Sequence, residues 1–188
     1  MRKIITVQDR EKKETRNKVI IGIVLVVLLV FSTAGYAFYR TGSDEIKKIL
    51  YKDIEFVLQN DGLWHAEVQG NELKTVFNPE ETENISGFLS ISLLNYQNKP
   101  LYFSYDSDRQ GVGEVVMNIG SHVGRVQHVC LDECEEDLPV KNCTENIIII
   151  REGEETLIKQ EDSCIYISGK GDIIRASDAF IFKLFKIN

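Results

Sequence analysis

The sequence predicts an α/β (or α+β) domain held to a membrane by one N-terminal transmembrane helix. Three observations predict it. Residues Val19–Tyr39 contain no charged side chain and lie between Lys18 and Arg40. Short apolar runs separated by turn-forming residues follow, and the second half of the chain alternates between strand and helix patterns. All four cysteines come after the apolar segment.

The apolar segment has the length of a membrane span. Its 21 residues, at about 1.5 Å each, make a helix of about 31 Å, which matches a hydrocarbon core of about 30 Å. The preceding tail has seven basic and three acidic side chains, a net charge of +4. We therefore expect residues 1–18 to be cytoplasmic and Val19–Tyr39 to lie in the cell membrane. Residues 40–52 are then a stalk and residues 53–188 an extracytoplasmic domain.

A cleaved signal peptide is the alternative interpretation of this segment. Its apolar centre also fits the hydrophobic region of such a peptide, and small residues that a signal peptidase accepts follow it. The two candidate cleavage sites are Ser32-Thr33-Ala34 and Gly35-Tyr36-Ala37. Under this interpretation the mature domain would leave the membrane.

The residues beyond the segment are strongly acidic. Residues 41–188 have 14 basic and 26 acidic side chains, a net charge of −12. A field of this sign repels nucleic acid, which we exclude as a partner. The acids are densest between Asp132 and Asp137. A protein partner of this acidic run would need a cationic surface. Calcium is the alternative ligand, although the D-x-D-x-D-G pattern of calcium-binding loops is absent.

A small β-meander is predicted first in the domain. The expected strands, separated by turn residues, are Ile54–Leu58, Leu63–Val68 and Leu73–Phe77. Trp64 alternates with Ala66 and Val68 and is expected in the core. The apolar residues of the stalk, Ile46, Ile49 and Leu50, indicate a short helix, and Asn78-Pro79 is a helix start signal.

A mixed sheet of β-α-β-β-β-α order is predicted next. The elements are strands over Leu101–Tyr105, Arg125–Cys130, Asn146–Ile150, the start of Thr156–Ile167 and Cys164–Ile167, a helix through Val112–Ile119, and a C-terminal helix over Asp172–Lys186. The strand–helix–strand unit at its start indicates a parallel crossover. Four consecutive isoleucines, Ile147–Ile150, are typical of a strand buried on both faces. Asp178 is expected on the solvated side of the last helix.

The cysteines predict two disulfides. An even number of cysteines in an extracytoplasmic domain favours pairing. A two-residue turn at Gly153-Glu154 would bring Cys143 opposite Cys164 in an antiparallel hairpin. Cys130 and Cys134 would then close a small local loop. The alternative is a zinc site made by His128 with three of the cysteines, although the spacing lacks a C-x-x-C unit.

Two further patterns mark candidate sites. Asn84-Ile85-Ser86 and Asn142-Cys143-Thr144 match the N-glycosylation acceptor pattern, and a disulfide at Cys143 would hinder access to Asn142. Asp106 and Asp108 follow the first strand of the mixed sheet, a common position for carboxylates that hold Mg²⁺. They are the candidate metal ligands of a surface hydrolase or phosphatase-like enzyme.

Several stretches of the domain carry a resemblance to known proteins. They are Val76–Glu80 with Asn84-Ile85, Leu138–Cys143, Cys164–Gly169 and Arg175–Phe180. In these stretches the chain resembles a group of uncharacterised archaeal single-pass membrane-anchored proteins with a cysteine-containing extracytoplasmic domain. The resemblance implies a related domain over most of residues 50–188 and no activity.

The predicted function is a membrane-anchored extracytoplasmic binding or structural module, for which one setting is a cell-envelope complex. The expected partners are the membrane, through Val19–Tyr39, and an envelope protein with a cationic surface. No cofactor is expected. The alternative is the metal-dependent hydrolase that uses Asp106 and Asp108.

Overall fold

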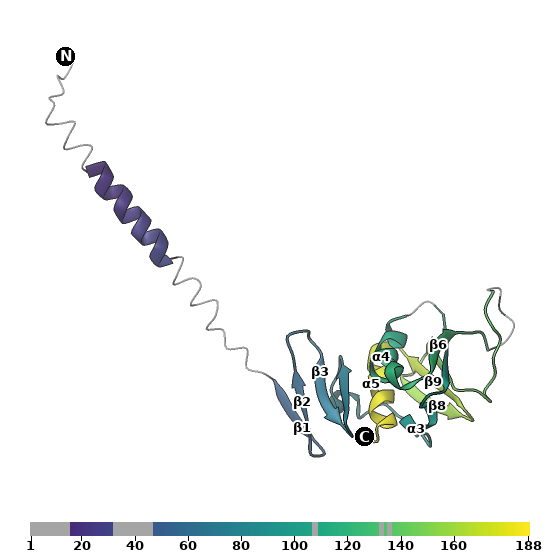
Figure 1. Ribbon diagram of the computed structural model, residues 1–188. Coiled ribbons are helices and arrows are strands. Elements are labelled where there is room, and N and C mark those ends of the chain that lie inside the picture. The colour runs from purple at the N-terminus through teal and green to yellow at the C-terminus, as the bar shows by residue number, and fades with distance from the viewer. Residues whose placement is uncertain (1–15, 32–46, 107–108, 132–133, 135–136) are drawn as a thin grey trace, which may run out of the picture. The chain divides into compact units, whose positions relative to one another are not determined.

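The computed structural model describes residues 16–31, 47–106, 109–131, 134 and 137–188 (Figure 1). The chain divides into two units, Met1–Glu45 and Ile46–Asn188. The first unit has one described helix, over residues 16–31. Within the described ranges, no helix is both long enough and apolar enough to cross a membrane. The predicted span continues to Tyr39, and its residues 32–39 lie outside the described part of the chain.

The second unit begins with a four-stranded antiparallel meander. Its strands, in spatial order, are β1 (Lys48–Tyr51), β2 (Ile54–Leu58), β3 (Trp64–Val68) and β4 (Asn71–Thr75). Positive φ angles at Lys52 and Asp53 (47° and 67°) form the two-residue turn that joins β1 to β2. The predicted three strands are present, but the helix expected through Ile49 and Leu50 is wrong. These residues pair with β2 instead, because the tight turn folds them back onto it.

A five-stranded mixed sheet follows. Its strands are β5 (Pro100–Tyr105), β6 (Arg125–His128), β7 (Ile147–Glu152), β8 (Leu157–Glu161) and β9 (Cys164–Gly169), in the spatial order β6-β5-β7-β9-β8. All neighbours are parallel except β8, which pairs antiparallel with β9 at the edge. This confirms the predicted mixed sheet and the parallel pairing of its first two strands. Ile147–Ile150 are at most 1% exposed, as predicted.

Four α-helices connect and cover these strands. They are α2 (Pro79–Thr82), α3 (Leu93–Tyr96), α4 (Gln110–Ile119) and α5 (Ile173–Leu184), with a 3₁₀ turn, η1 (Gly120–His122), after α4. Asn78 caps α2 as predicted, because its Oδ1 accepts from the Glu81 amide at 3.1 Å. Helix α5 begins after Asp172 and ends at Leu184, close to the predicted bounds.

The two longer helices form a layer between the two sheets (Figure 1). Phe103 and Ile148 of the mixed sheet share one core with Val115 of α4 and Phe180 of α5. The same core includes Trp64, 3% exposed and a core residue as predicted. On its other side, α5 meets the meander, where the rings of Phe182 and Phe56 pack edge to face at 5.8 Å. Helix α5 is therefore buried on both sides.

Candidate functional site

The carboxyl ends of the parallel strands are the first place to look for a site. The chain leaves β5 for β6 on one side and later enters β7 on the other side of β5. In open α/β sheets, ligands bind at such a point, beyond the carboxyl ends of the strands. Asp106 lies directly after β5, and Arg151 lies near the end of β7.

Asp106 is exposed and weakly paired there. The distance from its Oδ1 to Nε of Arg151 is 3.9 Å, and both side chains are more than half exposed. Such an ion pair contributes little in water. Beside it, the Tyr105 ring stacks on His128 at 4.1 Å between centroids. The second predicted ligand, Asp108, lies outside the described residues.

The described residues do not gather acids around Asp106. Across the described ranges, no group of three or more His, Cys, Asp or Glu side chains could hold a metal ion. The zinc alternative is wrong, because Cys130, Cys134 and Cys143 are all in disulfides.

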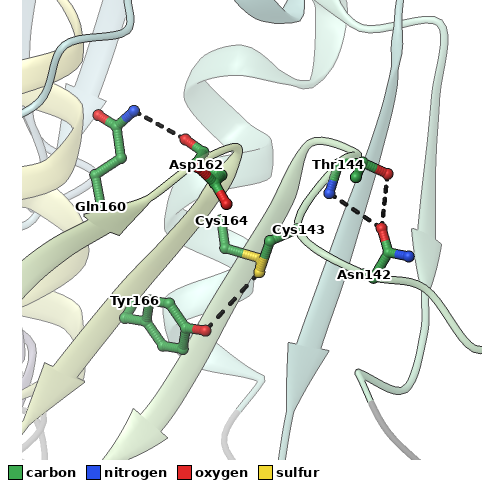
Figure 2. Close-up of a disulfide and its surroundings, with 7 residues drawn as sticks. All are labelled: Asn142, Cys143, Thr144, Gln160, Asp162, Cys164 and Tyr166. Carbon is green, nitrogen blue, oxygen red and sulfur yellow. Dashed lines mark hydrogen bonds between the residues drawn. A yellow bond between two sulfur atoms is a disulfide. The ribbon is translucent and has the colours of Figure 1, made fainter.

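One disulfide joins Cys143 to Cys164 (Figure 2). The other joins Cys130 to Cys134. Their Cα atoms are 5.0 Å and 6.3 Å apart, respectively. Cys164 is completely buried in a small second core on the face of the mixed sheet opposite to α5. Two disulfides indicate an oxidising, extracellular-type compartment for this domain.

The hairpin used to predict the Cys143–Cys164 pair is wrong, although the pair itself is present. Strand β7 lies parallel to β9, with Ile147 beside Cys164, and β8 is the strand antiparallel to β9. The two cysteines meet because the loop before β7 runs beside the start of β9. There the Ser163 amide donates to the Cys143 carbonyl at 3.1 Å.

Both glycosylation candidates are exposed. Oδ1 of Asn142 accepts from the amide and the hydroxyl of Thr144, at 3.1 Å and 2.6 Å (Figure 2). The Asn142 side chain is exposed next to the disulfide at Cys143. Whether the disulfide hinders glycosylation there stays a prediction. Oδ1 of Asn84 accepts from Arg175 at 2.6 Å. Of the acidic run Asp132–Asp137, only residues 134 and 137 are described.

The outer face of the meander has a hollow that the sequence analysis did not identify. This acidic hollow has a volume of about 700 Å³, and its lining includes His65 and four acidic residues, Asp53, Glu55, Glu67 and Glu72. The alternation of β2, β3 and β4 was the available signal, because side chains opposite to the core residues share one face.

His65 contacts two carboxylates at the acidic hollow. Its Nε2 lies 2.8 Å from Asp61 and its Nδ1 lies 3.2 Å from Glu72. The amide of Leu63 and then the His65 ring lower the pKa of Asp61. The His65 ring and then Lys74 lower the pKa of Glu72. The ring therefore holds two ionised carboxylates at the rim of the hollow.

A buried carboxyl pair connects the two helices to the meander. Asp178 of α5 is fully buried, so the prediction of a solvated side chain is wrong. Its Oδ2 accepts from the Phe77 amide at 2.8 Å. Burial raises the pKa of Asp178 to about 9, and Glu114 of α4 adds to the rise. Asp178 therefore keeps its proton at neutral pH. Burial also raises the pKa of Glu114.

Comparison of the chain with protein-family models, curated proteins and solved structures finds no match in any of the three. The class of the protein is therefore defined by its own structure. It is a disulfide-bonded α/β domain in which two helices lie between an antiparallel meander and a mixed sheet.

Proposed function

We propose that this protein is a membrane-anchored extracytoplasmic binding module, and that its acidic hollow binds a cationic surface of another envelope protein. The observation that carries the proposal is the charge of the hollow. Four carboxylates, those of Asp53, Glu55, Glu67 and Glu72, line it, and none of its described lining residues is Lys or Arg.

The charge of the whole domain supports a cationic partner. The net charge of −12 for residues 41–188 steers positively charged molecules toward the domain and repels nucleic acid. Glu55 and Glu72 already contact Lys48 and Lys74, both at the margin of the hollow. Asp53 and Glu67 are thus the two carboxylates that a partner would neutralise first.

The N-terminal segment supports the membrane anchor. The large apolar side chains of the helix over residues 16–31 are exposed, from 44% for Val27 to 72% for Phe31. A helix that is apolar on all sides requires an apolar surrounding. Under the proposal, lipid supplies it and Val19–Tyr39 is retained as a signal anchor. The resemblance to the archaeal membrane-anchored group is consistent with this arrangement.

The alternative of a hydrolase stays a prediction. Its support is the position of Asp106 beside the point where the strand order reverses. Among the described residues, Arg151 is the charged side chain beside Asp106, and Asp108 is not described. The acidic hollow brings four carboxylates together, so we favour the binding module.

The proposal can be tested by titrating the full chain, held in lipid nanodiscs, with a tetralysine peptide. We expect saturable binding that weakens steeply between 50 and 300 mM salt, because exposed charges are screened. The double variant Asp53→Asn/Glu67→Gln should bind at least about tenfold more weakly, which corresponds to about 1.4 kcal/mol. Isothermal calorimetry measures both effects.

The matched control is Glu154→Gln/Glu155→Gln, in the exposed turn before β8. It removes the same charge from the same domain but lies outside the lining of the hollow. We expect its affinity to stay within about twofold of the unmodified protein. Equal losses in both variants would show that net charge, and not the acidic hollow, attracts the peptide.

A further inference from the structure

A second hollow, of about 450 Å³, lies where four elements meet. The β3–β4 turn, α3, η1 and the end of α5 form its walls. We call it the α3–α5 hollow. Its residues Gln97 and His122 shortly precede β5 and β6. The hollow therefore lies near the amino ends of these parallel strands, whereas Asp106 lies at the carboxyl end of β5.

The polar lining of the α3–α5 hollow differs in charge from the rest of the domain. Its polar side chains include two basic groups, His122 and Lys186, and three amides, those of Gln69, Asn71 and Gln97. None of the described residues that line it is Asp or Glu. In a domain with a net charge of −12, a hollow free of carboxylates can accept an anion without direct repulsion.

Apart from Ser92, the remaining lining of the hollow is apolar. Leu93 and Leu94 of α3 and Leu184 of α5 contribute to it. Leu94 is 75% exposed, although it lies against a concave surface. A ligand with a short hydrocarbon part would cover this side chain and remove its apolar surface from water, which favours binding.

The carbonyl end of α5 opposes an anion at this place. A helix C-terminus disfavours a nearby anion, because its free carbonyl groups carry partial negative charge. The Gln69 amide already donates to the Phe185 carbonyl at 3.4 Å and occupies one of these acceptors. A hydrogen bond to a charged group contributes more to binding than the opposing effect of a helix end. The two basic side chains, Lys186 and His122, therefore favour a ligand with a negative charge.

We infer that the α3–α5 hollow binds a small organic anion, a carboxylate attached to a short apolar chain. Lys186 and His122 hold the carboxylate, and the chain lies against Leu93 and Leu94. This inference goes beyond the proposed function and does not depend on it. The two hollows would take ligands of opposite charge, so that one can fail without the other.

The test compares three probes that share one hydrocarbon chain: hexanoate, hexylamine and 1-hexanol. Each is titrated into the ¹⁵N-labelled full chain in lipid nanodiscs, and the backbone amide signals of Leu94 and His122 are followed by NMR. We expect saturable shifts with hexanoate, at least about tenfold weaker binding of hexylamine, and 1-hexanol in between. A tenfold difference corresponds to about 1.4 kcal/mol, within the range of one charge-assisted hydrogen bond.

Two variants and one control complete the test. Lys186→Gln/His122→Gln should weaken hexanoate binding at least about tenfold and leave 1-hexanol unchanged. Leu94→Ser, an exposed position where folding is not at risk, should weaken both probes. Lys170→Gln, an exposed lysine outside the hollow, should change neither. Equal affinities for hexanoate and hexylamine, or hexanoate shifts confined to other parts of the domain, would overturn the inference.

Discussion

Asp178 is a fully buried carboxyl group whose protonated form suits its surroundings. Below about pH 4 the group is protonated in both the folded and the unfolded chain. As the pH rises from there to about 9, the unfolded chain releases this proton while the folded chain retains it, because the pKa of Asp178 is raised to about 9. The free energy of unfolding therefore falls across this window, by at most about 1.4 kcal/mol per pH unit.

The substitution Asp178→Asn should remove most of this pH dependence. The amide keeps an acceptor for the Phe77 amide, and its NH₂ group can donate to Glu114. We expect the variant to be more stable than the unmodified protein at pH 8 and to lose less stability between pH 5 and pH 8. Urea unfolding at several pH values measures both.

Asp162→Asn is the control for Asp178→Asn. It removes a carboxylate at an exposed turn position with φ of 51°, which asparagine also tolerates. Its unfolding curve should follow the pH dependence of the unmodified protein. If Asp178→Asn shows that same dependence, the buried carboxyl is not its source.

At the scale of elements, the two disulfides hold different lengths of chain. Cys143–Cys164 spans 21 residues of sequence separation and ties the loop before β7 to β9, whereas Cys130–Cys134 spans four. Chain-entropy estimates give stabilisations of about 3.4 kcal/mol and about 2 kcal/mol for loops of these sizes. The longer loop also contributes to the small second core, in which Cys164 is buried.

We therefore expect Cys143→Ala/Cys164→Ala to lose more stability than Cys130→Ala/Cys134→Ala, by about 1–2 kcal/mol in the free energy of unfolding. Replacing both members of each pair leaves no unpaired thiol from the broken bond. Urea unfolding under non-reducing conditions measures the two losses. An equal or larger loss in the Cys130–Cys134 variant would contradict the expectation that Cys143–Cys164 is the more stabilising disulfide.

At the scale of the whole molecule, the proposed anchor can be tested through the charge of the N-terminal segment. Under the proposal, the seven basic side chains of the tail keep the N-terminus on the cytoplasmic side. Replacing both Val26 and Leu29 by lysine puts two charges near the middle of the segment. Each costs about 2.5–3.5 kcal/mol at a helix centre, so the variant should leave the membrane fraction.

Extraction of membranes at alkaline pH, followed by immunoblotting, measures this change. Ser43→Lys, which adds charge outside the segment, should remain in the membrane fraction. N-terminal sequencing distinguishes the anchor from a cleaved signal peptide. A mature chain that starts at Gly35 or Phe38 would show that the segment is removed.

Local sequence patterns predicted much of the fold. The Asn78-Pro79 start of α2, the buried isoleucines of β7 and the order of elements in the mixed sheet follow from short-range periodicity and capping. The strand at Lys48–Tyr51 could not be predicted from local patterns, because its pairing with β2 outweighs its local propensity. The acidic hollow was also missed, although its residues alternate in the expected way, because a concave surface depends on how strands twist together.

The sequence by itself determined the mixed α/β composition, the even number of cysteines that allows two disulfides and the step in charge across the apolar segment. These depend on residue types and on spacings along the chain. Only the tertiary structure decided that α5 is buried on both sides, that Asp178 faces Glu114 and Phe77, and that β7 is parallel to β9. Each of these depends on which distant segments pack together, and burial between two sheets is a property of the assembled layers that no local pattern encodes.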